Sequence, residues 1–264
     1  MAVETLLAGD IAGYFERNAD QPGVLWLFLH IPKTAGTSFR AEIAERLKPQ
    51  ANICVGAGYD TVQQALEAFL QPRPGKPVRF ASGHLRRPQA EAVMASRAEV
   101  RLITMLRSPV TRVVSDYRYQ RTPKHPGSAE FRERFPDFPS YLRWPGSQNR
   151  VFEFLKRGPT DRVADVIEDL ESRYAFVGLT EMYGLSRRML FQLLGLGRPP
   201  EVQRRNTTED REDNRIEDLE SLLPELRALN DKDLQIYRHF AERLRARREA
   251  IVDYLRTAPV SRAA

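Results

Sequence analysis

A strand that runs into a glycine-containing turn and then a helix constrains the fold more than any other feature of the sequence. Residues 24–31 form a nearly unbroken apolar run of strand length, VLWLFLHI. Such a run is typical of a strand covered on both faces in a parallel sheet. Pro32 cannot donate to the ladder of hydrogen bonds, and the residues after the turn predict a helix over 37–47. We therefore expect a sheet whose first strand leads directly into a helix.

The turn itself, PKTAGTS over 32–38, has the composition of an anion site. Gly36 lets the backbone approach a ligand closely, and Thr37 and Ser38 offer hydroxyls and are expected to cap the helix. The first N–H groups of that helix face the turn, and Lys33 adds a mobile positive charge. A phosphate or sulfate group is the predicted ligand. The order differs from the nucleotide loop GxxxxGK[ST], because Lys33 precedes Gly36.

The rest of the chain alternates strands and helices. We expect strands at 52–55, 76–82, 100–106 and 174–178, helices between them, and a long Arg-rich helix over 231–256. Repeated strand and helix units with apolar strands predict an α/β fold, a three-layer P-loop-like arrangement in which helices flank a central parallel sheet. Ligands of such sheets bind at the carboxyl ends of the strands. Lys33, His84 and Arg107 all follow predicted strand ends.

The chain of 264 residues is expected to form a single domain over 1–264, with an N-terminal extension at 1–22 and an insertion at 121–146. The insertion, RTPKHPGSAEFRERFPDFPSYLRWPG, is dense in proline, charge and aromatic residues. Long excursions in compact domains tend to be functional. We expect it to form an acceptor-side wall or lid, and a surface loop with no role in binding is the alternative.

Two motifs in order resemble one enzyme family. PKTAGTS closely resembles the 5′-phosphosulfate loop of sulfotransferases that use 3′-phosphoadenosine 5′-phosphosulfate (PAPS), in particular the carbohydrate branch that includes the uronosyl 2-O-sulfotransferases. LITMLRSPVTRVVSDYRY, over 102–119, resembles the family's 3′-phosphate element, a strand followed by Arg107 and then by Ser115 on the next helix. FVGLTE, over 176–181, is a further short resemblance.

This resemblance implies PAPS as the cofactor, its bisphosphate PAP as the product, and a hydroxyl acceptor, expected on a glycan or glycoconjugate. It implies that Lys33 reaches the bridging oxygen and that Arg107 and Ser115 bind the 3′-phosphate. The 5′-phosphate would be bound by the backbone of Thr34, Ala35, Gly36, Thr37 and Ser38. The alternative for Arg107 is that it caps a carbonyl, with Ser115 an ordinary helix residue.

A late segment, RRNTTED over 204–210, also resembles the family's loop over the adenosine end of the cofactor. The resemblance implies cofactor contacts from Arg205, Asn206 and Thr207. A polar surface loop is the alternative.

The acceptor hydroxyl must lose its proton, and His84 in FASGHLRR is the candidate base. Imidazole titrates near neutrality, so it can accept a proton at working pH. The GH phrase resembles the 2-O-sulfotransferase pattern, in which a histidine here is the catalytic base, but Ser82 stands where those relatives carry a second histidine. His30 is expected to pack within its strand. Arg86 and Arg87 are expected to meet an acidic acceptor or water.

The charge balance favours anionic partners without choosing among them. The chain has 41 Lys and Arg against 35 Asp and Glu, a net charge of +6, which suits a polyanionic cofactor, an acidic glycan or a nucleic acid. No nucleic-acid partner is expected on balance. No His, Cys, Asp and Glu cluster has metal-ligand spacing, so no metal site is expected. The single cysteine forms no internal disulfide.

The N-terminus carries Glu4 and Asp10 and lacks the pattern of a signal peptide, and no apolar run has membrane-spanning length. We therefore expect a cytoplasmic enzyme without a transmembrane segment. Two other functions stay open. A P-loop kinase would share the sheet and the anion turn, but needs Mg²⁺-binding carboxylates after a strand and a lysine in the other position. A non-catalytic module that binds nucleotide or nucleic acid would need neither Lys33 nor His84.

Overall fold

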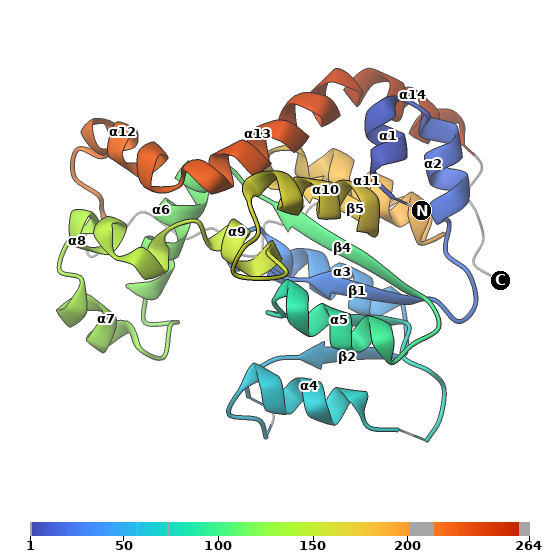
Figure 1. Cartoon of the computed structure of the whole chain (residues 1–264), viewed down its shortest axis with the longest axis horizontal. Helices are drawn as coiled ribbons and strands as arrows, with labels where there is room; N and C mark the ends of the chain where they lie inside the picture. Colours follow the sequence, from blue (N-terminus) through green and yellow to red (C-terminus); the bar gives the residue numbers. More distant parts are fainter. Residues whose placement is uncertain (1, 57, 73, 201–213, 259–264) are drawn as a thin grey trace.

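The structure, a computed structural model, describes residues 2–56, 58–72, 74–200 and 214–258. A five-stranded parallel sheet forms the centre of this part of the chain. The strand order is β2-β3-β1-β4-β5 (Figure 1). The strands are β1 (Leu25–Leu29), β2 (Gln50–Ile53), β3 (Phe80–Gly83), β4 (Val100–Leu106) and β5 (Tyr174–Leu179). Every residue of β1 is buried, as expected for the central strand of a covered parallel sheet.

Helices cover both faces of this sheet. The helices α4 (Val62–Leu70), α5 (Arg87–Ala95) and α10 (Val163–Arg173) lie on one face, and α3 (Gly36–Arg46) and α11 (Tyr183–Leu193) on the other (Figure 1). This arrangement follows from right-handed crossovers between parallel strands. The predicted fold class, a three-layer α/β fold with a central parallel sheet, is confirmed.

The stretch predicted as an N-terminal extension packs against the core. It forms α1 (Glu4–Ala8) and α2 (Ile11–Asn18). The Tyr14 hydroxyl donates to the Ala175 carbonyl at 2.7 Å, and the Val3 N–H donates to the Tyr174 carbonyl at 2.9 Å. These bonds tie the start of the chain to β5.

Three sequence predictions about regular structure are wrong in detail. The strand predicted at 52–55 lies earlier, at Gln50–Ile53. The strand predicted at 76–82 is shorter, Phe80–Gly83, because Pro77 near its start cannot donate to a ladder. The long helix predicted over 231–256 is two helices, α13 (Asp231–Ala246) and α14 (Arg248–Thr257). At the break, the Arg247 guanidinium donates to the carbonyls of Leu7 and Ala8, and Tyr254 of α14 stacks on Phe15 at 4.8 Å between ring centroids.

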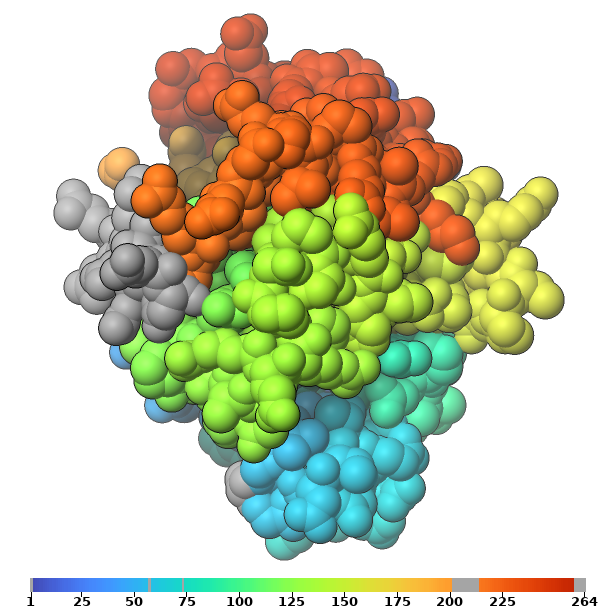
Figure 2. All heavy atoms as spheres, turned by 90° about the vertical axis from the view of Figure 1, so that its left-hand side faces the viewer, coloured from blue at the N-terminus to red at the C-terminus, as the bar shows by residue number. Residues whose placement is uncertain are grey.

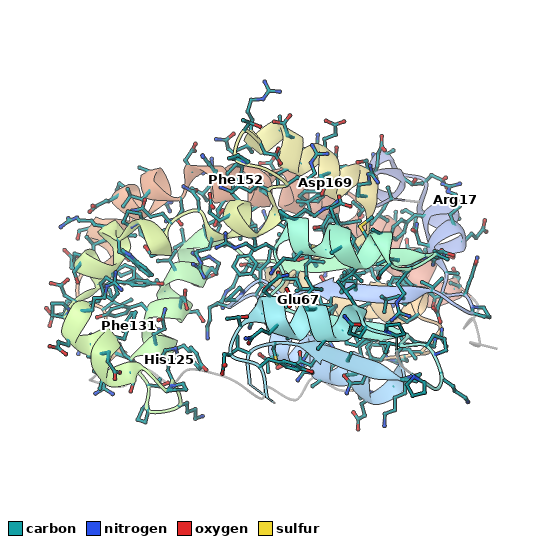
Figure 3. The ribbon with its side chains drawn as sticks, turned by 60° about the horizontal axis from the view of Figure 1, so that its bottom comes forward. Arg17, Glu67, His125, Phe131, Phe152 and Asp169 are labelled. Carbon is teal, nitrogen blue, oxygen red and sulfur yellow. The ribbon has the colours of Figure 1, made fainter. Side chains whose placement is uncertain are left out.

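The main hydrophobic core surrounds the sheet, and a second hydrophobic cluster lies beyond the carboxyl ends of the strands. We call α6 (Pro109–Gln120), α7 (Ser128–Arg134), α8 (Phe138–Arg143) and α12 (Leu219–Leu229) the helical unit. Figure 1 shows it at the left, Figure 2 shows the face that it forms, and Figure 3 places Phe131 inside it. The buried residues of the second hydrophobic cluster are Val113, Tyr117, Phe131, Phe135, Phe138, Tyr141, Leu142, Ile216 and Leu226.

The insertion predicted at 121–146 therefore folds into helices with a shared core. The short 3₁₀ helices η1 (Pro145–Ser147) and η2 (Thr180–Met182) and the helix α9 (Arg150–Leu155) complete the described elements. Two buried bonds lead from α9 to α13, because the Asp233 carboxylate accepts from the N–H groups of Val151 and Phe152 at 3.0 and 2.8 Å. These bonds hold α9 against α13.

Candidate active site

The three residues predicted at strand ends follow three neighbouring strands. His84 follows β3, Lys33 follows β1 and Arg107 follows β4, and β1 pairs with both of the others. The carboxyl edge of the sheet faces the helical unit (Figure 1). The structure therefore brings these side chains to one edge, the place where open α/β sheets bind ligands.

The turn between β1 and α3 has a backbone geometry that suits an anion. Lys33 and Ala35 both have left-handed backbone, with φ of 70° and 61°, and such alternation turns successive N–H groups toward one point. The buried Thr34 hydroxyl donates to the Ile31 carbonyl at 2.8 Å and fixes the turn from within.

The prediction that Thr37 and Ser38 cap the helix is wrong. The N-cap is Ala35, with no side-chain cap, and the helix begins at Gly36, so both hydroxyl residues lie inside the first turn. The N–H groups of a first turn have no partner within a helix. Because no side chain caps them here, they remain able to bind an anion, and the residues present fit a phosphate group.

The side chain of Lys33 extends from this turn to helix α6. Its ammonium is 3.7 Å from the centroid of the Tyr119 ring, a cation–π distance. Burial lowers the Lys33 pKa to about 8; the Asp116 carboxylate opposes this shift and Arg107 adds to it. The Lys33 ammonium is therefore expected to lose its proton at a lower pH than an ordinary lysine.

Arg107 ties the end of β4 to the turn. Its Nη1 donates to the Lys33 carbonyl at 3.1 Å and its Nε to the Thr111 hydroxyl at 3.0 Å. A guanidinium has five donors, so these two bonds leave others for a ligand. Burial lowers the Arg107 pKa, while Glu181 raises it. The carbonyl contact considered from the sequence is thus present. It uses only part of the N–H donors of the guanidinium.

Glu181 lies close to this arginine, and Ser115 follows it on α6. Ser115 is half-buried on α6, two turns after Arg107. The Glu181 carboxylate, from the FVGLTE phrase, accepts from the Ser108 N–H at 2.9 Å. The carboxylate thus lies beside the N-cap of α6, and its charge raises the Arg107 pKa.

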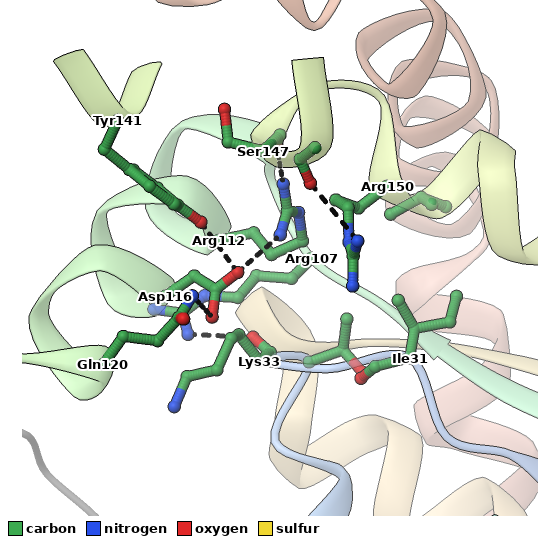
Figure 4. A network of polar contacts seen from close by, with 12 residues as sticks. Ile31, Lys33, Arg107, Arg112, Asp116, Gln120, Tyr141, Ser147 and Arg150 are labelled. Carbon is green, nitrogen blue, oxygen red and sulfur yellow. Dashed lines mark hydrogen bonds and ion pairs between the residues drawn. The ribbon is translucent and has the colours of Figure 1, made fainter. Parts of the chain in front are cut away.

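Asp116 lies in a polar network of the helical unit, near Lys33 of the turn (Figure 4). Its carboxylate accepts from the Tyr141 hydroxyl at 3.0 Å and lies 3.6 Å from the buried Arg112 guanidinium. Arg112 in turn donates to the Ser147 carbonyl at 2.9 Å. The same carboxylate acts on the pKa of Lys33. Sequence patterns gave no signal for this network, which depends on contacts between segments far apart in the chain.

His84 has the orientation of a general base. Its Nδ1 is 2.7 Å from the His30 carbonyl oxygen. A carbonyl only accepts, so Nδ1 carries the hydrogen and Nε2 of the neutral ring has a free lone pair. Burial lowers the His84 pKa, and the nearby Arg150 acts in the same direction, while the bond to His30 opposes them. The neutral form is thus favoured at neutral pH.

Arg150 is a site residue that the sequence did not indicate. Its Nη1 donates to the Gly146 carbonyl at 3.2 Å, and its side chain points toward the region of Ile31 in Figure 4. It stands at the start of α9, outside every motif noted above. Its charge acts on His84.

Two other predictions have different outcomes. Arg87 does not meet an acceptor or water, because it is fully buried and bonds to both Asp169 oxygens at 2.7 and 3.0 Å. A buried guanidinium needs such a partner. Asp169 lies beside α5 in Figure 3. Arg86 is exposed. The predicted cofactor residues Arg205, Asn206 and Thr207 lie outside the described residues.

The described residues contain no group of three or more His, Cys, Asp or Glu side chains placed to hold a metal ion. Within the same residues, the helices are too short or too polar to cross a membrane.

Comparison with known proteins gives distant structural likenesses. No protein-family model matches the chain, and no curated protein matches it. Among solved structures, the crystal structure of the mouse sulfotransferase SULT7A1 complexed with PAP aligns over 95% of this chain and 95% of that one. The sequence identity is 17% and the TM-score is 0.39. At these values the likeness carries no argument about activity, which must come from this chain's own residues.

Proposed function

We propose that the protein is a sulfotransferase that moves a sulfuryl group from PAPS to a hydroxyl. The observation that carries the proposal is the strand-edge arrangement. An uncapped helix N-terminus with a half-buried lysine follows the central strand, and a histidine with a free Nε2 follows the strand beside it. The first part suits a phosphosulfate and the second suits removal of a proton from an alcohol.

The residues that would hold PAPS are those of the turn and of the β4–α6 junction. The backbone of Thr34 to Ser38 would bind the 5′-phosphate, while Arg107 and Ser115 would bind the 3′-phosphate. Arg107 retains donors for this role beside its bond to the Lys33 carbonyl. When bound, PAPS supplies an activated sulfuryl group, whose transfer to the hydroxyl oxygen releases PAP.

The chain's own chemistry is proton removal and charge stabilisation. His84 accepts the hydroxyl proton at Nε2, because Nδ1 is held by the His30 carbonyl. The Lys33 ammonium stabilises the negative charge that gathers on the departing phosphate. Arg107 holds the Lys33 carbonyl and so keeps the ammonium at the turn.

The proposed acceptor is a carbohydrate hydroxyl. This part of the proposal rests on the resemblance of the GH phrase at His84, and Ser82 departs from that resemblance. The acceptor would enter on the His84 side of the turn, where Arg150 places a positive charge.

Transfer of radiolabelled sulfate from PAPS to a panel of glycans, lipids and small alcohols tests this function, with His84→Ala as the matched control. We expect label in at least one acceptor with the wild-type chain and almost none with the variant. Phosphate transfer from Mg²⁺-ATP without sulfate transfer would identify a kinase instead. Salt-dependent nucleic-acid binding without either transfer would identify a binding module.

A further inference from the structure

The His30 side chain, which the proposed chemistry does not use, lies against His84. The two imidazole centroids are 4.4 Å apart and the ring planes are tilted by 32°. On the other side, His30 stacks on Phe28 with 5.5 Å between centroids and 12° between planes. The backbone N–H of His30 donates to the Gly83 carbonyl at 2.9 Å. The parallel pairing of β1 with β3 thus sets the two histidines side by side.

The His30 ring also lies directly against the start of α3. A Cβ added at Gly36 would be 2.0 Å from the His30 Cδ2 and 2.2 Å from its Nε2. Gly36 is not among the residues with positive φ, so its backbone is one that alanine adopts readily. Space for the His30 ring, rather than backbone freedom, therefore requires glycine at this position.

The His30 ring stays neutral throughout the working pH range. Burial lowers its pKa to about 3, and the charges of His84, Arg40 and Lys33 act in the same direction. A neutral ring cannot repel a protonated His84, and it does not compete with His84 for the acceptor proton. The neutral His30 ring packs against both Phe28 and the His84 ring.

We infer that His30 is a positioning residue for His84: its backbone carbonyl fixes the His84 tautomer, and its ring, wedged against Gly36, fixes the orientation of the His84 ring. The inference rests on the proposed function for its catalytic meaning. Its geometric content, a His30 ring that holds the His84 ring, does not depend on any turnover.

The first experiment separates the His30 ring from its nitrogens. His30→Ala removes the ring and keeps the carbonyl, whereas His30→Phe keeps a ring that cannot titrate. NMR titration of His84 should show its pKa rising toward the ordinary histidine value in His30→Ala, because the ring loses the neighbour that shields it from water. In His30→Phe the titration should stay close to that of the wild type.

Turnover should follow the same order. His30→Ala should lower the rate roughly ten- to a hundredfold through a misplaced base, and His30→Phe should rescue most of that loss. Affinity for PAP, measured by calorimetry, should be similar in all three chains and reports whether the variants are folded. If His30→Phe loses as much as His30→Ala, the ring nitrogens contact substrate and the positioning role is overturned.

The second experiment is a double-mutant cycle with Gly36→Ala. In the wild type the new methyl must displace the His30 ring, so Gly36→Ala should lower the midpoint of thermal unfolding and shift the His84 titration. In the His30→Ala background the space is open, and the same change should have little effect on either. Additive effects would overturn the inference. Because unfolding and NMR require no sulfate transfer, failure of the proposed function and failure of this inference give different results.

Discussion

The carboxyl edge of the sheet and the helical unit beside it are held together by different forces. At the edge, backbone carbonyls hold the side chains, since Arg107 bonds to the Lys33 carbonyl and His84 to the His30 carbonyl. In the helical unit, rings pack on rings, as Tyr117 does on Phe138 at 5.2 Å between centroids. Backbone contacts fix atoms precisely, whereas ring packing mainly supplies stability. Substitutions at the edge should therefore change chemistry, and substitutions in the unit should change stability.

The largest expected effect is at the edge. His84→Ala should lower sulfate transfer by roughly a hundred- to ten-thousandfold, because the proposed general base is lost. PAP affinity and the midpoint of thermal unfolding should stay close to wild type, since the variant gives up one hydrogen bond, from the His84 ring to the His30 carbonyl.

The pH profile gives an independent check on His84. The neutral imidazole is the base, so the wild-type rate should fall as pH drops through a pKa below the ordinary histidine value. Near-normal turnover in the variant, with the same acid limb, would remove His84 from the chemistry.

In the helical unit, the matching test is Phe138→Ala. Phe138 is 2% exposed and lies in the aromatic cluster, so its loss should reduce the free energy of unfolding by about 3–5 kcal/mol. Urea unfolding measures this, and PAP affinity below the transition should be unchanged. Phe176→Ala in β5 is the control, because Phe176 stacks on Phe39 of α3 at 6.1 Å and its loss should weaken PAP binding as well. Equal loss of PAP binding in both variants would contradict the division between edge and unit.

The same division explains what the sequence could predict. The strand, turn and helix around Lys33 are encoded by neighbouring residues, and the parallel sheet follows from the repetition of such units. The contact between His30 and His84 depends on β3 pairing with β1, a neighbour relation that alternation of elements does not specify. Arg87 looked like a surface residue because its partner Asp169 is 82 positions away. The cap at α3 was wrong because Ala35 adopts a left-handed backbone, which is unusual for alanine.

Lys33 lies where the edge meets the unit, and its substitution should have the next largest effect. Lys33→Ala should lower turnover about a hundred- to a thousandfold and lower PAP affinity much less, because the ammonium acts on charge that develops during transfer. Steady-state kinetics and calorimetry separate the two effects. A pure loss of affinity with normal turnover would place Lys33 away from the reacting atoms.

The titration of Lys33 should also be visible in the wild type. An ammonium is charged below its pKa, so kcat/KM should fall as pH rises above about 8. Lys33→Arg is the control, since a guanidinium stays charged across this range and should abolish that alkaline limb. Persistence of the limb in Lys33→Arg would assign it to another group.

The smallest of the expected effects is the most informative about the edge, because Arg107 has both a structural contact and a proposed ligand. Arg107→Ala should weaken PAP binding about ten- to a hundredfold, the value of a charge-assisted phosphate contact of roughly 1.5–3 kcal/mol. AMP, which lacks the 3′-phosphate, measures the structural contribution alone. If Arg107 binds the 3′-phosphate, calorimetry should show a large loss for PAP and a small one for AMP. Arg107→Lys keeps the charge without the forked donors and should recover only part of the PAP affinity. Equal losses for PAP and AMP would mean that Arg107 serves only to hold the Lys33 carbonyl, and the 3′-phosphate would then need another partner at this edge.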